Sequence, residues 1–263
     1  MEQVAGDTPS RLPGICRLTL ADLGAALAAG WRDLKRAPQC GVFVSAIFVL
    51  AGMYVFWELA AAGGGWWIFV VALGFPLVAP FAAVGFYEIS RRLEQGEPVS
   101  FGRVFERILH ERNRQVPSMV VFMLLVFMFW VFAAHLVFGL FFGASAMMDI
   151  SSSFALLWSP RGLAMLATGS LVGAAFAFLV FATTVIGLPL IVDREIDVVS
   201  AAIVSWKVVL GNPGPMLVWA VTVSALLLLG MVPFFLGLFV VLPLLGHATW
   251  HLYRRAVLPD EAA

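Results

Sequence analysis

Apolar residues run through most of this chain in long stretches, which short amphipathic segments separate. Six of the stretches approach the roughly 20 residues that an α-helix needs to cross the hydrocarbon core of a bilayer. We predict membrane spans over residues 41–57, 66–87, 116–142, 162–192, 216–229 and 234–253. The fourth stretch has no charged residue, and Pro189 is a plausible kink within it.

Three amphipathic segments precede the first, third and fifth spans. Their apolar residues recur every three or four positions, which predicts helices over 20–36, 101–113 and 198–210. Thr19 with Asp22 resembles a capping box, while Ser100 and Asp197 are expected to cap the second and third helices. The first stripe consists of Leu20, Leu23, Leu27, Trp31 and Leu34. We expect all three helices to lie close to the membrane plane, with residues such as Glu111 facing water.

These elements predict an all-α, polytopic membrane protein. One unit, an interfacial amphipathic helix followed by a helical hairpin, occurs three times and gives six transmembrane helices. Residues 19–258 form a single transmembrane domain on this interpretation. The polar residues 1–18 are expected to be a disordered tail, and 259–263 a short C-terminal tail.

Composition supports a membrane location. Hydrophobic residues make up 62% of the chain and charged residues only 12%, about half the charge of an ordinary soluble domain. The formal net charge is zero, so there is no overall basic field for nucleic acid. The expected partners are membrane lipids and other inner-membrane proteins.

The few basic residues indicate how the chain is oriented. Of 16 Lys and Arg residues, all except Arg161 lie in the N-terminal segment, the second-to-third connector, the fourth-to-fifth connector or the C-terminus. Positive charge marks the cytoplasmic side, so both termini are predicted to be cytoplasmic in a bacterial inner membrane. Cys16 and Cys40 lie on that same side, where thiols stay reduced.

Polar residues recur at matching positions after the prolines of the even-numbered spans. Asp193 and His247 follow Pro189 and Pro243 by four residues. Steps of four keep side chains on one helix face. We therefore predict one polar cluster at the cytoplasmic end of the bundle, in which Asp193 is the partner of His247; its members are Glu88, Asp193, Asp197, His247 and His251.

The histidine pair has two interpretations. His247 and His251 are one helical turn apart, and with Asp193 they have the residue types of a metal site. Alternatively, they are interfacial histidines that bond to neighbouring groups, with Trp250 and Tyr253 as membrane anchors. No resident cofactor is predicted, although a metal ion is possible.

His135 is the one ionisable residue deep within a span and is either a functional group or a neutral imidazole bonded to a carbonyl on the next helix.

Several segments resemble an uncharacterised bacterial integral-membrane family, catalogued as a domain of unknown function. They are GLPLIVDREID, SWKVVLGNPGPMLVWA, FPLVAPFAAVGFYEISRRLEQGE and LGLFVVLPLLGHATWHLYRR, in which GHATWH is the most specific phrase. More distantly, the plan is similar to six-span modules fused to glycerophosphodiesterases. Automated labels for the family invoke cytochrome c oxidase subunit I, but that core needs six histidine ligands and this chain has four. The resemblance implies an inner-membrane location and no established activity.

No Walker loop, nucleophile elbow or HExxH motif occurs in the sequence. We therefore expect a non-enzymatic structural or accessory membrane protein. The alternatives are a small-solute transporter or channel, and a metal- or haem-handling helper of respiratory complex assembly.

The basic-residue bias makes a testable prediction about topology. In a Cys16→Ala, Cys40→Ala background, Asp149→Cys should react with a membrane-impermeant maleimide added outside intact spheroplasts. Lys207→Cys should react only after the membrane is permeabilised, because it lies on the cytoplasmic side. Labelling of position 149 from the cytoplasm alone would overturn this topology.

Overall fold

The computed structural model describes residues 12–61, 82–111, 114–143, 158–194 and 196–259, and it places most of them in helices. The labelled helices are α1 (Leu20–Arg36), α2 (Pro38–Ala61), α4 (Phe101–Glu111), α5 (Val116–Phe142), α6 (Pro160–Thr184), α7 (Gly187–Asp193), α8 (Val198–Gly211), α9 (Pro213–Met231) and α10 (Leu238–Ala256). Residues 82–95 form a further helical segment. Within these ranges there is no named strand, so the predicted all-α class is confirmed.

Four segments of the described residues are long and apolar enough to cross a membrane: Pro38–Glu58, Val116–Phe142, Pro160–Asp193 and Pro213–Met231. They correspond to the first, third, fourth and fifth predicted spans. Most of the second predicted span, residues 66–81, lies outside the described residues. Helix α10 begins at Leu238 rather than at residue 234 and is not among the four. The count of six and the threefold repeat therefore stay predictions.

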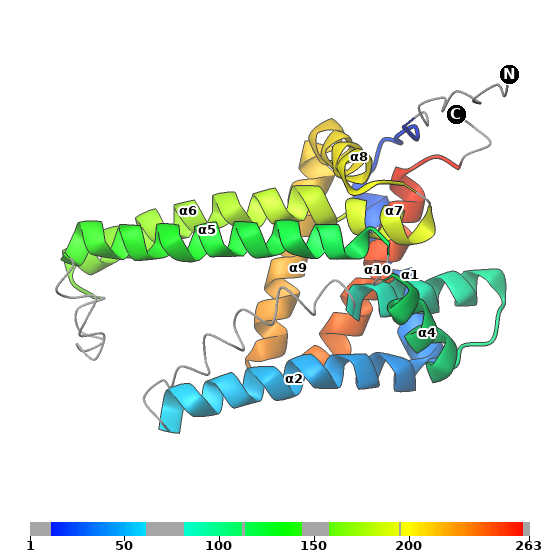
Figure 1. Cartoon of the computed structure of the whole chain (residues 1–263), viewed down its shortest axis with the longest axis horizontal. Coiled ribbons are helices and arrows are strands. Elements are labelled where there is room, and N and C mark those ends of the chain that lie inside the picture. The colour runs from blue at the N-terminus through cyan, green and yellow to red at the C-terminus, as the bar shows by residue number, and fades with distance from the viewer. Residues whose placement is uncertain (1–11, 62–81, 112–113, 144–157, 195, 260–263) are drawn as a thin grey trace, which may run out of the picture.

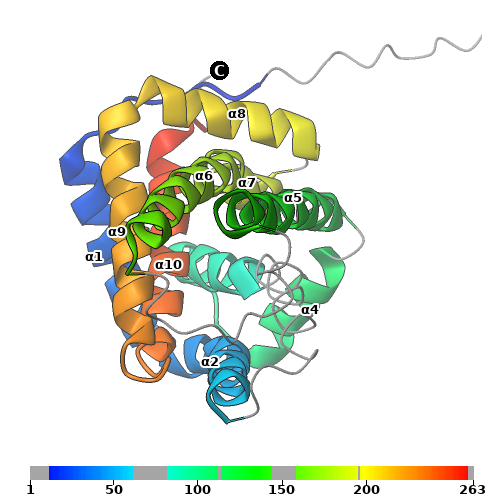
Figure 2. The same cartoon turned by 90° about the vertical axis from the view of Figure 1, so that its left-hand side faces the viewer.

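Helix α10 is the central element of the fold. It packs against α1, α2, α7 and α9. Helices α5 and α6 lie side by side, whereas α1 and α8 run across their direction in both views (Figures 1 and 2). Helix α9 also slopes across α5 and α6 (Figures 1 and 2). Because α9 is itself a candidate span, a crosswise course does not place α1 and α8 relative to a membrane, and their orientation near the membrane plane stays a prediction.

Two of the three predicted helix caps, at Thr19 and Asp197, are confirmed, while the cap expected at Ser100 stays a prediction. The Thr19 side chain accepts a hydrogen bond from the Asp22 N–H, and the Asp22 carboxylate accepts one from the Thr19 N–H, which completes the capping box of α1. The Asp197 carboxylate accepts hydrogen bonds from the N–H groups of Val199 and Ser200 at the start of α8. Such caps satisfy backbone donors that the first turn of a helix leaves open.

The buried faces of two of these helices differ from the predicted ones. In α1, Leu23 and Leu34 of the predicted stripe are buried, but Leu20 and Trp31 are exposed. The packed face also contains Ala26, Gly30 and Asp33. The small residues allow α1 to lie directly on α10 at Gly30, where a larger side chain would clash. In α4, Glu111 is buried rather than facing water, because Arg107 and Arg114 form ion pairs with its carboxylate.

The N-terminal residues also differ from the expected disordered tail. Residues 12–18 are ordered, because the Cys16 N–H donates to the Ala256 carbonyl and the Leu258 N–H donates to the Gly14 carbonyl, each at 2.9 Å. The Leu18 N–H donates to Asn212 Oδ1 at 2.7 Å. This segment therefore ties the end of α10 to the corner between α8 and α9. Residues 1–11 lie outside the described residues.

Gly30 controls the approach of α1 to α10. A Cβ atom at this position would lie 2.6 Å from the backbone nitrogen of Ala248, which is closer than real Cβ contacts allow. Because the near atom belongs to the backbone of a buried helix, no side-chain rotation relieves the clash. Glycine at position 30 is therefore a requirement of the packing.

We expect Gly30→Ala to destabilise the protein by about 1–3 kcal/mol, the usual cost of overpacking. Gly24→Ala on the same helix is the matched control, because a Cβ there meets nothing within 4 Å. Both substitutions favour helix formation by up to about 1 kcal/mol, so their difference isolates the contact. Thermal unfolding in a mild detergent measures it, and equal midpoints for the two variants would contradict the close packing.

Candidate functional site

A chain of four buried or partly buried polar side chains joins three helices at one end of the molecule. His251 Nε2 lies 2.7 Å from Asp33 Oδ2. Ser90 also hydrogen-bonds the Asp33 carboxylate, and Ser90 Oγ lies 2.9 Å from His247 Nδ1. Asp33 belongs to α1, Ser90 to the helical residues 82–95, and both histidines to α10. We call these four residues the buried polar chain.

Close helix packing brings the members of the chain together. Asp33 and His251 each follow the Gly30–Ala248 contact by three residues, about one helical turn. On the other side of α10, a Cβ at Gly246 would lie 2.6 Å from Phe86 Cδ2. Gly246 therefore lets residues 82–95 approach α10, which places the Phe86 carbonyl 3.2 Å from His247 Nδ1.

The partners determine where the protons lie. A carbonyl oxygen only accepts, so His247 Nδ1 carries a hydrogen and donates to the Phe86 carbonyl and to Ser90 Oγ. The Ser90 hydroxyl is then free to donate to the Asp33 carboxylate, which also accepts from His251 Nε2–H. In this arrangement the imidazole of His247 is neutral.

Asp33 is the charged centre of the chain. Burial by itself would raise the pKa of this carboxyl group, but hydrogen bonds from His251 and Ser90 outweigh it and lower the pKa below its ordinary value. Asp33 is therefore ionised at neutral pH although its side chain is buried.

His247 Nε2 is buried and has no hydrogen-bond partner among the described residues. In the tautomer derived above, this atom carries only a lone pair. An unsatisfied buried acceptor costs about 1–3 kcal/mol, so the buried polar chain tolerates this penalty at His247 Nε2. The ring of Phe86 packs edge-on against the imidazole, with the ring centroids 5.6 Å apart.

The predicted polar cluster is distributed over separate partners. Asp193 accepts a hydrogen bond from the Tyr253 hydroxyl at 2.6 Å and pairs with Arg254, so it is not the partner of His247 as we predicted. Glu88 is buried and forms ion pairs with Arg91 and Arg92. Asp197 caps α8. The spacing after each proline positioned these residues along their own helices but did not determine which neighbours they face.

The arrangement of the described side chains does not provide a set of metal ligands. No group of three or more His, Cys, Asp or Glu side chains in the described part of the chain could hold a metal ion. His247 and His251 bond to Ser90 and Asp33, while Asp193 is engaged by Tyr253. Metal binding by His247, His251 and Asp193 would require these contacts to be broken.

His135 lies apart from the chain. Its side chain is exposed on α5, and its Nδ1 bonds to the Val131 carbonyl of the same helix at 2.7 Å. The predicted bond to a neighbouring helix is replaced by a local one, which lets the imidazole satisfy one nitrogen within its own helix.

Sequence reasoning missed Asp33 and Ser90. Asp33 lies within the predicted helix 20–36 but outside its apolar stripe, so the pattern gave it no role. The available signal was its spacing from Ala26, Ala29 and Gly30, small residues that share its face and mark a close helix contact. Ser90 carries no such signal, because its role depends on two residues far away in the sequence.

The helical fold and its four candidate spans define an integral membrane protein of the polytopic all-α class. Residues 68–193 match a family model described as predicted integral membrane protein (DUF2189), which confirms the resemblance to a membrane domain of unknown function. The match ends at Asp193, before α8, α9 and α10. No curated protein and no solved structure matches the chain.

The buried polar chain predicts a difference between two buried serines. Ser90→Ala should destabilise the protein by about 1–3 kcal/mol, because it leaves Asp33 and His247 without a shared partner. Ser45 is equally buried, but its hydroxyl has no hydrogen-bond partner among the described residues, so Ser45→Ala should be neutral or stabilising. Thermal unfolding of the two variants checks this, and a larger loss for Ser45→Ala would refute it.

Proposed function

We propose that this chain is a non-enzymatic accessory protein of a bacterial inner membrane, with both termini in the cytoplasm. Its role is to present membrane-embedded surfaces to lipids and to other inner-membrane proteins. The polar groups that could carry chemistry hold its own helices together, and the surfaces of its spans are left for partners.

The observation that carries this proposal is that the buried polar groups bond to one another. Asp33, Ser90 and His247 are buried and bond to one another, so they are not presented to a substrate. Two pockets among the described residues lie elsewhere, on α8 and beside α2 and α4, and none of the buried polar chain lines them. A nucleophilic serine needs an accessible face and an adjacent base, and Ser90 has no accessible face.

The spans provide the other half of the argument. Along α5, large apolar side chains are exposed at helical spacing: Val121, Leu125, Phe129, Phe132, Leu136 and Leu140. They form one outward stripe, which we call the α5 stripe. Such a stripe suits lipid chains or the apolar face of a neighbouring transmembrane helix.

Purification from native membranes tests the accessory role. With a tagged wild-type chain in mild detergent, we expect a defined set of inner-membrane proteins to copurify in constant ratio. Phe129→Ala with Phe132→Ala should lower their recovery at least severalfold, because truncating large aromatic contacts removes the anchors of such an interface.

Leu163→Ala with Leu171→Ala on α6 is the matched control, because it also truncates two exposed apolar side chains and should not change recovery. Recovery of the chain alone, combined with solute flux in proteoliposomes, would contradict the proposal and favour a transporter. Recovery alone with stoichiometric metal or haem would contradict it in favour of an assembly helper.

A further inference from the structure

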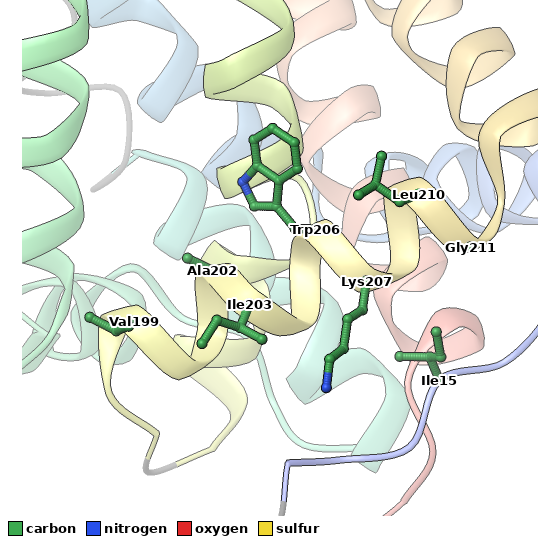
Figure 3. A pocket seen from close by; sticks show the side chains of 8 residues that line it. All are labelled: Ile15, Val199, Ala202, Ile203, Trp206, Lys207, Leu210 and Gly211. Carbon is green, nitrogen blue, oxygen red and sulfur yellow. The ribbon is translucent and has the colours of Figure 1, made fainter.

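The outer face of α8 carries an apolar groove beside one lysine. The groove has a volume of about 620 Å³ and is lined by Ile15, Val199, Ala202, Ile203, Trp206, Lys207, Leu210 and Gly211. Lys207 is the single charged residue in this lining, and no carboxylate contributes to it. Figure 3 shows the Lys207 side chain extending from α8 on the side where Ile15 lies.

Among the described residues, no side chain covers the apolar part of this surface, and none pairs with its basic group. Val199, Ile203 and Leu210 are exposed. Lys207 has no ion-pair partner among the described residues, and Asp197, the N-cap of the same helix, is engaged by backbone N–H groups. The groove therefore offers an unpaired ammonium group at the edge of exposed hydrocarbon surface.

A second cation, Arg17, follows the groove residue Ile15 by two positions in the sequence. Residues 14–16 pair with the last residue of α10 and the two residues after it, through a bridge between Ile15 and Val257. Arg17 is exposed, and a spacing of two residues from Ile15, which lines the groove, is the spacing that keeps side chains on one face of an extended segment. Arg17 likewise has no ion-pair partner within the part of the chain that the structure describes.

The groove wall is fixed in position. Trp206 donates a hydrogen bond from Nε1 to Thr183 Oγ1 at 3.0 Å, and its ring packs edge-on against Phe178 with centroids 5.7 Å apart. These contacts attach α8 to α6, so the apolar floor does not need to form when a ligand arrives. Tryptophan at such a position is typical of the interface between hydrocarbon and headgroups.

We propose that this groove binds one anionic phospholipid of the cytoplasmic leaflet. Its phosphate pairs with Lys207 and Arg17, and an acyl chain covers Ala202, Ile203 and Leu210. A small soluble anion would neutralise the lysine but leave the apolar surface exposed, whereas an uncharged lipid would do the reverse. The inference rests on the membrane location and cytoplasmic orientation proposed above.

Native mass spectrometry of the full chain, purified in an uncharged detergent, tests the site with phosphatidylglycerol and with phosphatidylcholine of the same acyl chains. Wild type should retain one phosphatidylglycerol in preference to phosphatidylcholine. Lys207→Gln should weaken phosphatidylglycerol retention about fivefold, since one basic residue near an anionic membrane surface contributes about 1 kcal/mol. Retention of phosphatidylcholine should not change.

Two further variants separate this site from general attraction to charge. Lys35→Gln removes a lysine on α1 whose ammonium group lies over the Trp31 ring. This variant should retain phosphatidylglycerol at the wild-type level. Ala202→Phe fills the groove without changing charge and should lower retention of phosphatidylglycerol. Thermal unfolding confirms that each variant is folded.

Equal losses in Lys207→Gln and Lys35→Gln would overturn the proposal, and so would wild type showing no preference for phosphatidylglycerol. Unchanged retention in Ala202→Phe would overturn the assignment to this groove. Lipid binding is measured on purified protein in detergent, so its result does not depend on the accessory role or on the predicted topology. A failure of the lipid-binding proposal can therefore be told apart from a failure of the proposed function.

Discussion

The Asp33 carboxylate is the group on which the arrangement of helices depends. It is buried and ionised, and an unpaired buried carboxylate would be too costly for the fold. His251 and Ser90 supply its hydrogen bonds from two other helical segments. To meet Asp33 at this distance, α1 must lie directly on α10, and glycine at position 30 makes that contact possible. The helix packing and the polar pairing therefore require each other.

The remaining charges at this end of the molecule follow the same rule. Glu111 pairs with Arg107 and Arg114, although its side chain is fully buried. Arg107 also donates to the Val192 carbonyl at 2.5 Å and so connects α4 with α7. Removing one partner of a buried pair costs about 3–5 kcal/mol, since the other charge stays buried. These interactions hold short helices against the ends of apolar spans, where hydrophobic contact with lipid gives no preference for one helix neighbour over another.

The sequence was most informative where a feature depends on neighbouring residues. The capping box at Thr19 and the cap at Asp197 were predicted because their partners lie two or three residues away. The apolar stretches likewise predicted the four candidate spans found among the described residues. Contacts between distant segments could not be predicted in this way. Ser90 and His247 are 157 residues apart, and no local pattern connects them. The alignment on prolines paired Asp193 with His247, but the rotation of each helix turns Asp193 toward Tyr253.

The central claim is that Asp33 and His251 stabilise the fold through each other, and a double-mutant cycle tests it most directly. Asp33→Asn, His251→Gln and the double variant are compared with wild type by unfolding in the same detergent at neutral pH. Residues in one hydrogen-bond network show coupling energies of about 0.5–3 kcal/mol, and we expect a value above about 1 kcal/mol here. Losses that add to within about 0.3 kcal/mol would show that the two residues act independently and would contradict the account.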